Sequence, residues 1–402
     1  MAAASPLDQL PAELFAQLLR SIDSPRDLRS FIGACPTAFR RYMVHKSYIL
    51  QPISRQLKIR FQATGQLSNA LIAARLRCIQ NDLPYLEPRQ AQEQVWPILE
   101  SPPLESSTWE INLCVICHLF RLSREADHCI ARYADEAWAK VQDEAEIYAI
   151  LEFTNYFGPL PEPPPLRRTP LLLSPSERKR LEEAFLTFDI YRHTTHYDTT
   201  ILREVEIDWP IQMPIAWPWF IREGFQAPDW KLRAFQSIFS FIFNKYHFLV
   251  HRLTKRLERQ RDSGMLLRSI DNLGPNRVWQ FLQRTPHEEL TFIAYLCSHG
   301  YFLLVSLEHM DSECLERFIL TMFLWRCLPQ AQSAWSLATD EALGSSLKAL
   351  GTGVNTDMGV YNEPWTKGRY FGDRDRLEQL EDRAIDAAVP YRVKYKSWLE
   401  RK

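Results

Sequence analysis

The chain lacks an excess of charge of either sign. Its 402 residues include 48 basic and 49 acidic side chains, which give a formal net charge of −1 at pH 7. Proteins that attract nucleic acids or anionic membranes through their overall field usually carry a clear positive excess. The near balance argues against such a field, and we expect neither a nucleic-acid partner nor a membrane partner.

Signals for export are also missing. The opening sequence MAAASPLDQLPAE holds no basic segment followed by an apolar one, as a secretory leader would. The chain contains no N-x-S/T glycosylation acceptor, and its eight cysteines fall at irregular positions. Together these features predict an intracellular protein, in the cytoplasm, the nucleus or both, whose cysteines are reduced.

Long apolar runs are scarce, and only residues 290–307, LTFIAYLCSHGYFLLVSL, approach the length of a membrane-spanning helix. Ser298, His299 and Gly300 lie in the middle of this run. Polar or flexible groups at that position would be costly in lipid. The stretch therefore predicts two buried helices that meet at Gly300.

Recognisable catalytic motifs are absent. The sequence has neither a GxxxxGK[ST] phosphate loop nor a GxSxG nucleophile elbow. The Gly-Thr-Gly sequence at 351–353 lacks the third glycine of a dinucleotide loop, and His193 and His196 lack the HExxH pattern of a zinc protease. We therefore expect a protein that is not an enzyme.

One cysteine motif is present, but its context does not favour a cofactor. Cys114-Val115-Ile116-Cys117-His118 spells the CxxCH of c-type haem attachment, yet it lies inside an apolar helical pattern. With His128 or Cys129 it could complete a tetrahedral zinc set, which would require a bend near Ser123. Buried cysteines more often behave as small hydrophobes. The sequence therefore predicts no cofactor and no metal site.

The most informative stretch that is present runs from residue 7 to 42. Pro11, Pro25 and Pro36 each suit the first turn of a helix, because proline has a fixed φ and lacks an N–H that would be unpaired there. Ser24 can cap the second helix, and Asp27 lies in its first turn, where an acidic side chain is favoured. The pattern predicts three short helices, roughly at 11–21, 25–33 and 36–45.

The first of these helices carries two apolar stripes about 100° apart. One stripe is enough to reach an intramolecular core, so the second can contribute to an interface, at roughly 1.5–3 kcal/mol for each large side chain it buries. A block of about 40 residues must in any case pack on the rest of the chain or on a partner. The stripes are Leu10, Leu14 and Leu18, and Phe15, Leu19 and Ile22.

The same residues carry a resemblance to a known family. The pattern Leu10-Pro11-x-Glu13-Leu14, Leu18-Leu19, Ile22, Ser24-Pro25-x-Asp27-Leu28, Phe31-Ile32, Ala34-Cys35 and Phe39-Arg40 is similar to the F-box. Phe39 stands where many F-boxes have tryptophan, and Pro36 begins a third helix that often lacks a proline. In both features the chain resembles the F-box-like proteins of filamentous fungi. The match covers about a tenth of the chain.

This resemblance implies a function. In the F-box family, the three-helix block docks onto a Skp-type adaptor of a cullin-based (SCF) ubiquitin ligase, and the rest of the chain recruits a protein target. On that basis, the residues expected at the adaptor interface are Leu10, Pro11, Leu14, Leu18, Leu28 and Phe39. The alternative is a helical interaction scaffold that is not part of a ligase and whose block packs against its own chain. An adaptor should leave Leu10, Leu14 or Leu18 accessible, whereas a scaffold should bury both stripes.

The remaining pattern predicts an all-α fold, with a large, irregular helical region after the block. Seven prolines between 159 and 175 favour an extended connector, and a proline-bearing stretch at 84–103 interrupts the helical pattern. We expect a charge-rich helix at 124–141 to be solvated surface.

The predicted organisation is 1–50 F-box-like domain, 51–158 helical region, 159–175 proline-rich linker and 176–402 C-terminal helical domain. Further helices are expected at 67–79, 108–122, 230–261, 312–327 and 374–388, with capped starts at Ser174 and Thr285.

Overall fold

The computed structural model describes residues 9–80, 88–100, 107–157, 172–195, 229–263 and 275–326. These residues form twelve α-helices and one short 3-10 helix, and none of them lies in a strand. The predicted all-α fold class is therefore confirmed for the described part of the chain. Most of the predicted linker at 159–175, the tryptophan-rich stretch around 209–220 and the predicted helix at 374–388 lie outside the described residues.

The three predicted N-terminal helices are present as α1 (Ala12–Arg20), α2 (Pro25–Ala34) and the first part of α3 (Pro36–Ala63). The Ser24 hydroxyl accepts a hydrogen bond from the backbone N–H of Asp27, as expected for the cap of α2. His45 has non-helical backbone angles (φ −112°, ψ 17°), so α3 bends where the sequence pattern ended its third helix. Beyond the bend, α3 continues to Ala63.

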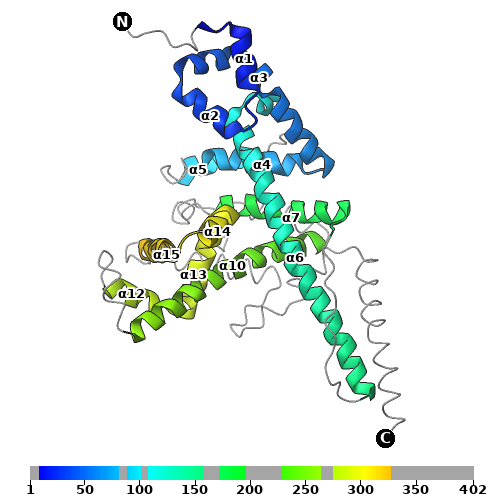
Figure 1. Ribbon diagram of the computed structural model, residues 1–402, viewed down its shortest axis with the longest axis vertical. Helices are drawn as coiled ribbons and strands as arrows, with labels where there is room; N and C mark the ends of the chain where they lie inside the picture. The colour runs from blue at the N-terminus through cyan, green and yellow to red at the C-terminus, as the bar shows by residue number, and fades with distance from the viewer. Residues whose placement is uncertain are drawn as a thin grey trace.

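One hydrophobic core joins this N-terminal block to the rest of the molecule. Phe15 and Leu19 of α1 are fully buried against side chains of α3, and the same core continues as far as Phe323. In Figure 1 the block lies at one end of the molecule, and a single long helix runs from beside it past the central helices. The block therefore packs against the rest of its own chain, as its small size requires.

That long helix is α6 (Leu113–Phe157), which packs on α4 (Leu67–Ile79). The prediction of two helices with a break near Ser123 is wrong: no proline interrupts this region, and the buried Leu122 and Ala126 carry the helix across the junction. The predicted interruption at 84–103 is also partly wrong. Helix α5 (Pro88–Glu100) begins at a proline and contains Pro97, and a 3-10 helix (Ser107–Ile111) precedes α6.

The C-terminal helices largely follow the predicted pattern. Two of them, α7 and α13, begin with capping boxes in which Ser174 and Thr285 exchange hydrogen bonds with glutamates three residues later. Gly300 has a φ of +82° and separates two helices, as predicted for the 290–307 stretch. No described helix is both long enough and apolar enough to cross a membrane. The helices are α7 (Pro175–Thr195), α10 (Asp229–Asp262), α12 (Pro275–Leu282), α13 (Pro286–Ser298), α14 (Gly300–Glu308) and α15 (Ser312–Arg326).

Buried ion pairs connect the central helices, and they correct one prediction. Glu125, which the sequence placed on a solvated face of α6, is buried and accepts two hydrogen bonds from Arg77 of α4, at 3.2 and 2.8 Å. The same guanidinium donates to both carboxylate oxygens of Asp189 in α7, at 2.6 and 2.9 Å. Periodicity reveals which face carries charge but not which neighbouring helix supplies the partner.

Two further ion pairs involve side chains of α6. Arg60 of α3 donates to Glu182 of α7 at 3.0 Å and to Asp127 of α6 at 2.7 Å. Arg132 of α6 pairs with Glu308 of α14. Charged side chains of α6 therefore form ion pairs with neighbouring helices. Through Arg60, the second part of α3 is joined to α6 and α7.

A buried histidine beside this network makes stability depend on pH. His193 is fully buried, with its Nε2 atom 3.6 Å from Asp189 Oδ2. Burial, together with the positive charges of Arg192 and Arg77, lowers the pKa of His193 to about 3, although Asp189 acts in the opposite direction. In the unfolded chain, the imidazole binds a proton near its ordinary pKa of about 6.5.

Because the unfolded state binds the proton more readily, we expect stability to fall as pH drops from about 6.5 towards 3, by as much as roughly 1.4 kcal/mol per pH unit. Urea unfolding at pH 7 and pH 5 measures this difference. In His193→Gln the difference should shrink by about 2 kcal/mol, whereas in His309→Gln, at an exposed position, it should persist. Equal pH dependence in wild type and His193→Gln would contradict the assignment.

Candidate partner-binding surface and cysteine–histidine cluster

Helix α1 presents one of its two apolar stripes to solvent. Leu14 is 52% exposed and Leu18 is 43% exposed, while Leu10 is partly buried. On the other stripe, Phe15 and Leu19 are fully buried. The helix therefore uses one stripe for the core and leaves the other one available.

Helix α3 extends this uncovered apolar region. Phe39 is 50% exposed, and Met43 and Val44 are also exposed on the same part of the helix. The guanidinium carbon of Arg20, at the end of α1, lies 4.3 Å from the centre of the Tyr48 ring of α3 and links the two helices. We define the α1–α3 surface as Leu14, Leu18, Phe39, Met43, Val44 and Tyr48.

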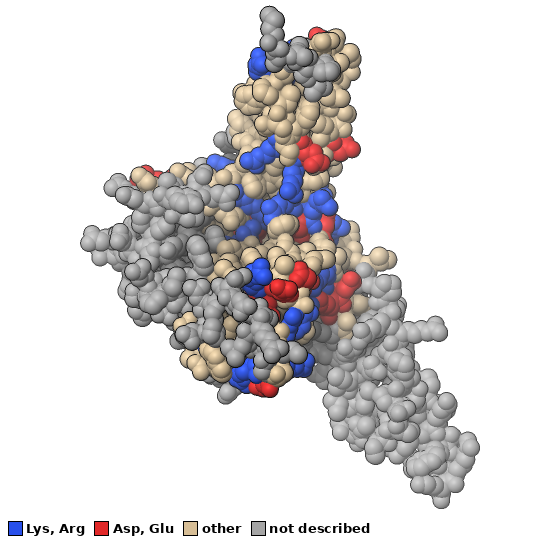
Figure 2. Space-filling view, turned by 60° about the vertical axis from the view of Figure 1, so that its left-hand side comes forward, with Lys and Arg blue, Asp and Glu red and all other residues tan. Residues whose placement is uncertain are grey.

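This surface concentrates exposed apolar side chains in a small part of the chain. Six of the eleven exposed large hydrophobic residues in the described structure lie between residues 14 and 48. In Figure 2 the upper end of the molecule, where the block lies, shows few charged side chains, and basic and acidic side chains gather below it. Clustered exposed apolar groups of this kind mark interaction sites more often than scattered ones do.

Pro11 and Leu28, which were also expected at the interface, have structural roles within the block. Pro11 precedes α1, and its carbonyl oxygen accepts the first helical hydrogen bond, from the N–H of Phe15 at 3.0 Å. Leu28 is fully buried in the core, so in this structure it supports the block from inside. The structure therefore exposes Leu14, Leu18 and Phe39 together and keeps Leu28 away from solvent.

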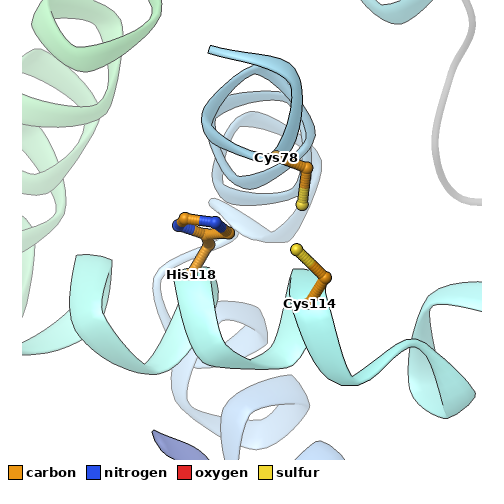
Figure 3. A group of neighbouring side chains, drawn as sticks. All are labelled: Cys78, Cys114 and His118. Atoms are coloured by element: carbon orange, nitrogen blue, oxygen red, sulfur yellow. The ribbon is translucent and has the colours of Figure 1, made fainter. Parts of the chain in front are cut away.

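A second candidate site lies between α4 and α6. The ligand atoms of Cys78, Cys114 and His118 all lie within 4.8 Å of one another, and all three residues are partly buried. In Figure 3 the two sulfur atoms point toward each other, and the His118 ring lies beside them. Cys114 and His118 are four residues apart on α6, so both side chains lie on the same face of that helix.

The two thiols of the cluster have pKa values shifted in opposite directions. The hydrogen bond from Cys78 and a second one from His118 lower the pKa of Cys114 well below its usual value, although burial opposes this change. The same hydrogen bond, with burial, raises the pKa of Cys78. The arrangement therefore favours a Cys114 thiolate beside a protonated Cys78.

The zinc set considered from the sequence is not assembled. The Cys117 thiol donates to the carbonyl oxygen of Pro25 in α2 at 3.3 Å. His128 shares a hydrogen bond with the Tyr301 hydroxyl at 3.0 Å, and Cys129 is fully buried. Because α6 is continuous, the two halves of the set stay apart. Sequence reasoning missed Cys78, since it lies on another helix and no ligand spacing connects it to Cys114.

No protein-family model, curated protein or solved structure matches this chain. What the geometry defines is an all-α protein with an exposed apolar surface at one end and a compact cysteine–histidine cluster behind it.

Proposed function

We propose that this chain is an F-box-type adaptor, whose α1–α3 surface binds a Skp-type linker protein and whose remaining helices recruit a protein target to a cullin-based ubiquitin ligase. The observation that carries the proposal is the exposed stripe of Leu14 and Leu18 on a helix whose other stripe is buried. Ligase chemistry would then belong to its partners, and this chain would act by docking.

The energetics of the surface support a docking role. Burying a large apolar side chain contributes roughly 1.5–3 kcal/mol. The α1–α3 surface offers six such side chains on two adjacent helices, and a few of them can supply most of the affinity of an interface. Leu14, Leu18 and Phe39 of this surface also belong to the F-box-like pattern, and that resemblance supports a Skp-type protein as the partner.

The arrangement of the helices also suits an adaptor that holds two proteins at a fixed separation. Helix α6 runs from the N-terminal block into the central body, and Arg60 ties α3 to α7 and α6. A partner docked on the block would therefore have a defined position relative to the C-terminal helices. The scaffold alternative requires both stripes of α1 to be buried, and the exposure of Leu14 and Leu18 favours the adaptor.

The test is co-purification of the full chain with a Skp-type adaptor. We expect a stoichiometric complex with the wild-type chain. Leu14→Asp with Leu18→Asp, and separately Phe39→Asp, should each weaken binding by at least about 30-fold, because a charge would replace a buried apolar contact. Calorimetry on the purified proteins would give the affinities.

Ile59→Asp is the matched control. Ile59 is an equally exposed apolar residue on α3, beyond the bend at His45 and outside the α1–α3 surface. This variant should bind like the wild type. If a folded wild-type chain forms no complex, or if Ile59→Asp weakens binding as much as the α1 double variant, the adaptor proposal fails.

A further inference from the structure

The Cys78, Cys114 and His118 cluster has the composition of a transition-metal site. Once metal binding displaces the Cys78 proton to solvent, the site offers two thiolates and one imidazole, and these ligands favour zinc-class cations over magnesium or calcium. With Zn–S near 2.3 Å and Zn–N near 2.0 Å, tetrahedral ligand atoms stand about 3.5–3.8 Å apart. The three ligand atoms here lie within 4.8 Å of one another, so small side-chain rotations would bring them to that spacing.

We propose that Cys78, Cys114 and His118 bind one zinc-class divalent cation and leave the fourth coordination position to a water molecule. The site belongs to the all-α body and does not depend on the proposed adaptor function. It would join the end of α4 to the beginning of α6, two helices that already pack closely.

The surrounding structure fixes the two helices that carry the three side chains before any metal arrives. The Asn112 side-chain oxygen accepts hydrogen bonds from the N–H groups of Cys114 at 3.0 Å and Val115 at 3.3 Å, which caps the start of α6. On α4, Arg77 precedes Cys78 and is held by the buried carboxylates of Glu125 and Asp189. The helix segments that carry the ligands are therefore held in place by neighbouring contacts, which favours a preformed metal site.

The neighbouring Cys117 is not one of the proposed ligands. Its thiol donates to the Pro25 carbonyl oxygen in α2, so it is engaged elsewhere although it lies between Cys114 and His118 in the sequence. The three proposed ligands are only partly buried, which leaves a path for the cation and room for a water molecule. A bound cation would stabilise the folded chain, because the unfolded chain does not hold the ligands together.

The test uses Co²⁺ as a spectroscopic probe on the full-length chain, after chelation and complete thiol reduction. We expect one equivalent of Co²⁺ to bind, with a thiolate-to-metal charge-transfer band and the intense visible bands of a tetrahedral site, and Zn²⁺ to displace it. Cys78→Ser, Cys114→Ser and His118→Gln should each weaken binding by at least about 10-fold. Cys117→Ser should leave both the stoichiometry and the spectrum unchanged.

A second measurement does not require a substituted chain. Alkylation of the wild-type thiols, followed by mass spectrometry, should show that Zn²⁺ protects Cys78 and Cys114, while the exposed Cys314 reacts at the same rate with or without metal. Failure of the reduced chain to bind Co²⁺ through thiolates would overturn the proposal. So would equal alkylation of Cys78 with and without Zn²⁺, or loss of binding in Cys117→Ser to the same extent as in Cys78→Ser.

Discussion

Replacing Arg77 with methionine is expected to lower the free energy of unfolding by about 3–5 kcal/mol, the usual cost of removing one member of a buried ion pair. Arg77 is buried and donates to Glu125 and Asp189, each of which is also buried. Burial by itself lowers the pKa of Arg77, but the two carboxylates raise it to a net value above the ordinary one. Without the guanidinium, two buried negative charges lose their common partner, while the salt bridges of Arg121 with Glu125 and of Arg192 with Asp189 remain.

Urea unfolding at pH 7, followed by circular dichroism, measures the effect. Arg317→Met is the control, because Arg317 forms an exposed pair with Glu313 within one helix and should change stability by less than about 0.5 kcal/mol. Arg77→Met combined with Glu125→Gln should recover part of the loss, since one unpaired charge is then removed. A loss below about 1 kcal/mol in Arg77→Met would mean that the network does not support the core.

Gly300→Ala is expected to destabilise the chain by about 3 kcal/mol. Gly300 has a φ of +82°, a conformation that costs an L-residue roughly 1–2 kcal/mol. A Cβ atom at this position would also lie 2.5 Å from Nε of Arg192. Arg192 cannot move away cheaply, because it is buried and donates to Asp189 Oδ1 at 2.7 Å.

The matched control is Gly33→Ala. Gly33 lies within α2, and a Cβ atom there would meet no other atom within 4 Å. This substitution should be neutral or stabilise the chain by up to about 1 kcal/mol, because alanine favours a helix more than glycine does. Thermal and urea unfolding of both variants give the comparison. If Gly300→Ala unfolds at the same denaturant concentration as wild type, the turn between α13 and α14 must tolerate the side chain.

Local sequence signals predicted the N-terminal helices well, because their ends depend on nearby residues. Proline at the first turn and the Ser24 cap act over only a few residues, and the structure has both at their expected positions. The predicted end of the third helix at 45 coincides with the bend at His45, although α3 continues beyond it. The capping boxes at Ser174 and Thr285 were predictable for the same reason. The positive φ at Gly300 follows from glycine lacking a Cβ atom.

Features that depend on distant parts of the chain were not predictable in the same way. Nothing in the sequence near Glu125 indicates that Arg77, 48 residues earlier, will neutralise it. Likewise, Cys78 meets Cys114 only because α4 packs on α6. The two stripes of α1 were visible in the sequence, but which one would face the core depended on the packing of α2 and α3.

The bend at His45 divides α3 into two parts with different attachments. The part before the bend carries Phe39 and Met43 of the α1–α3 surface, and the part after it carries Arg60, which is joined to α7 and α6. For a protein docked on the first part, the angle at this one residue would set the direction in which it projects from the body. If a partner docks there as proposed, a change at the bend would alter the direction of that partner while leaving Phe39 and Met43 in place on the first part of the helix.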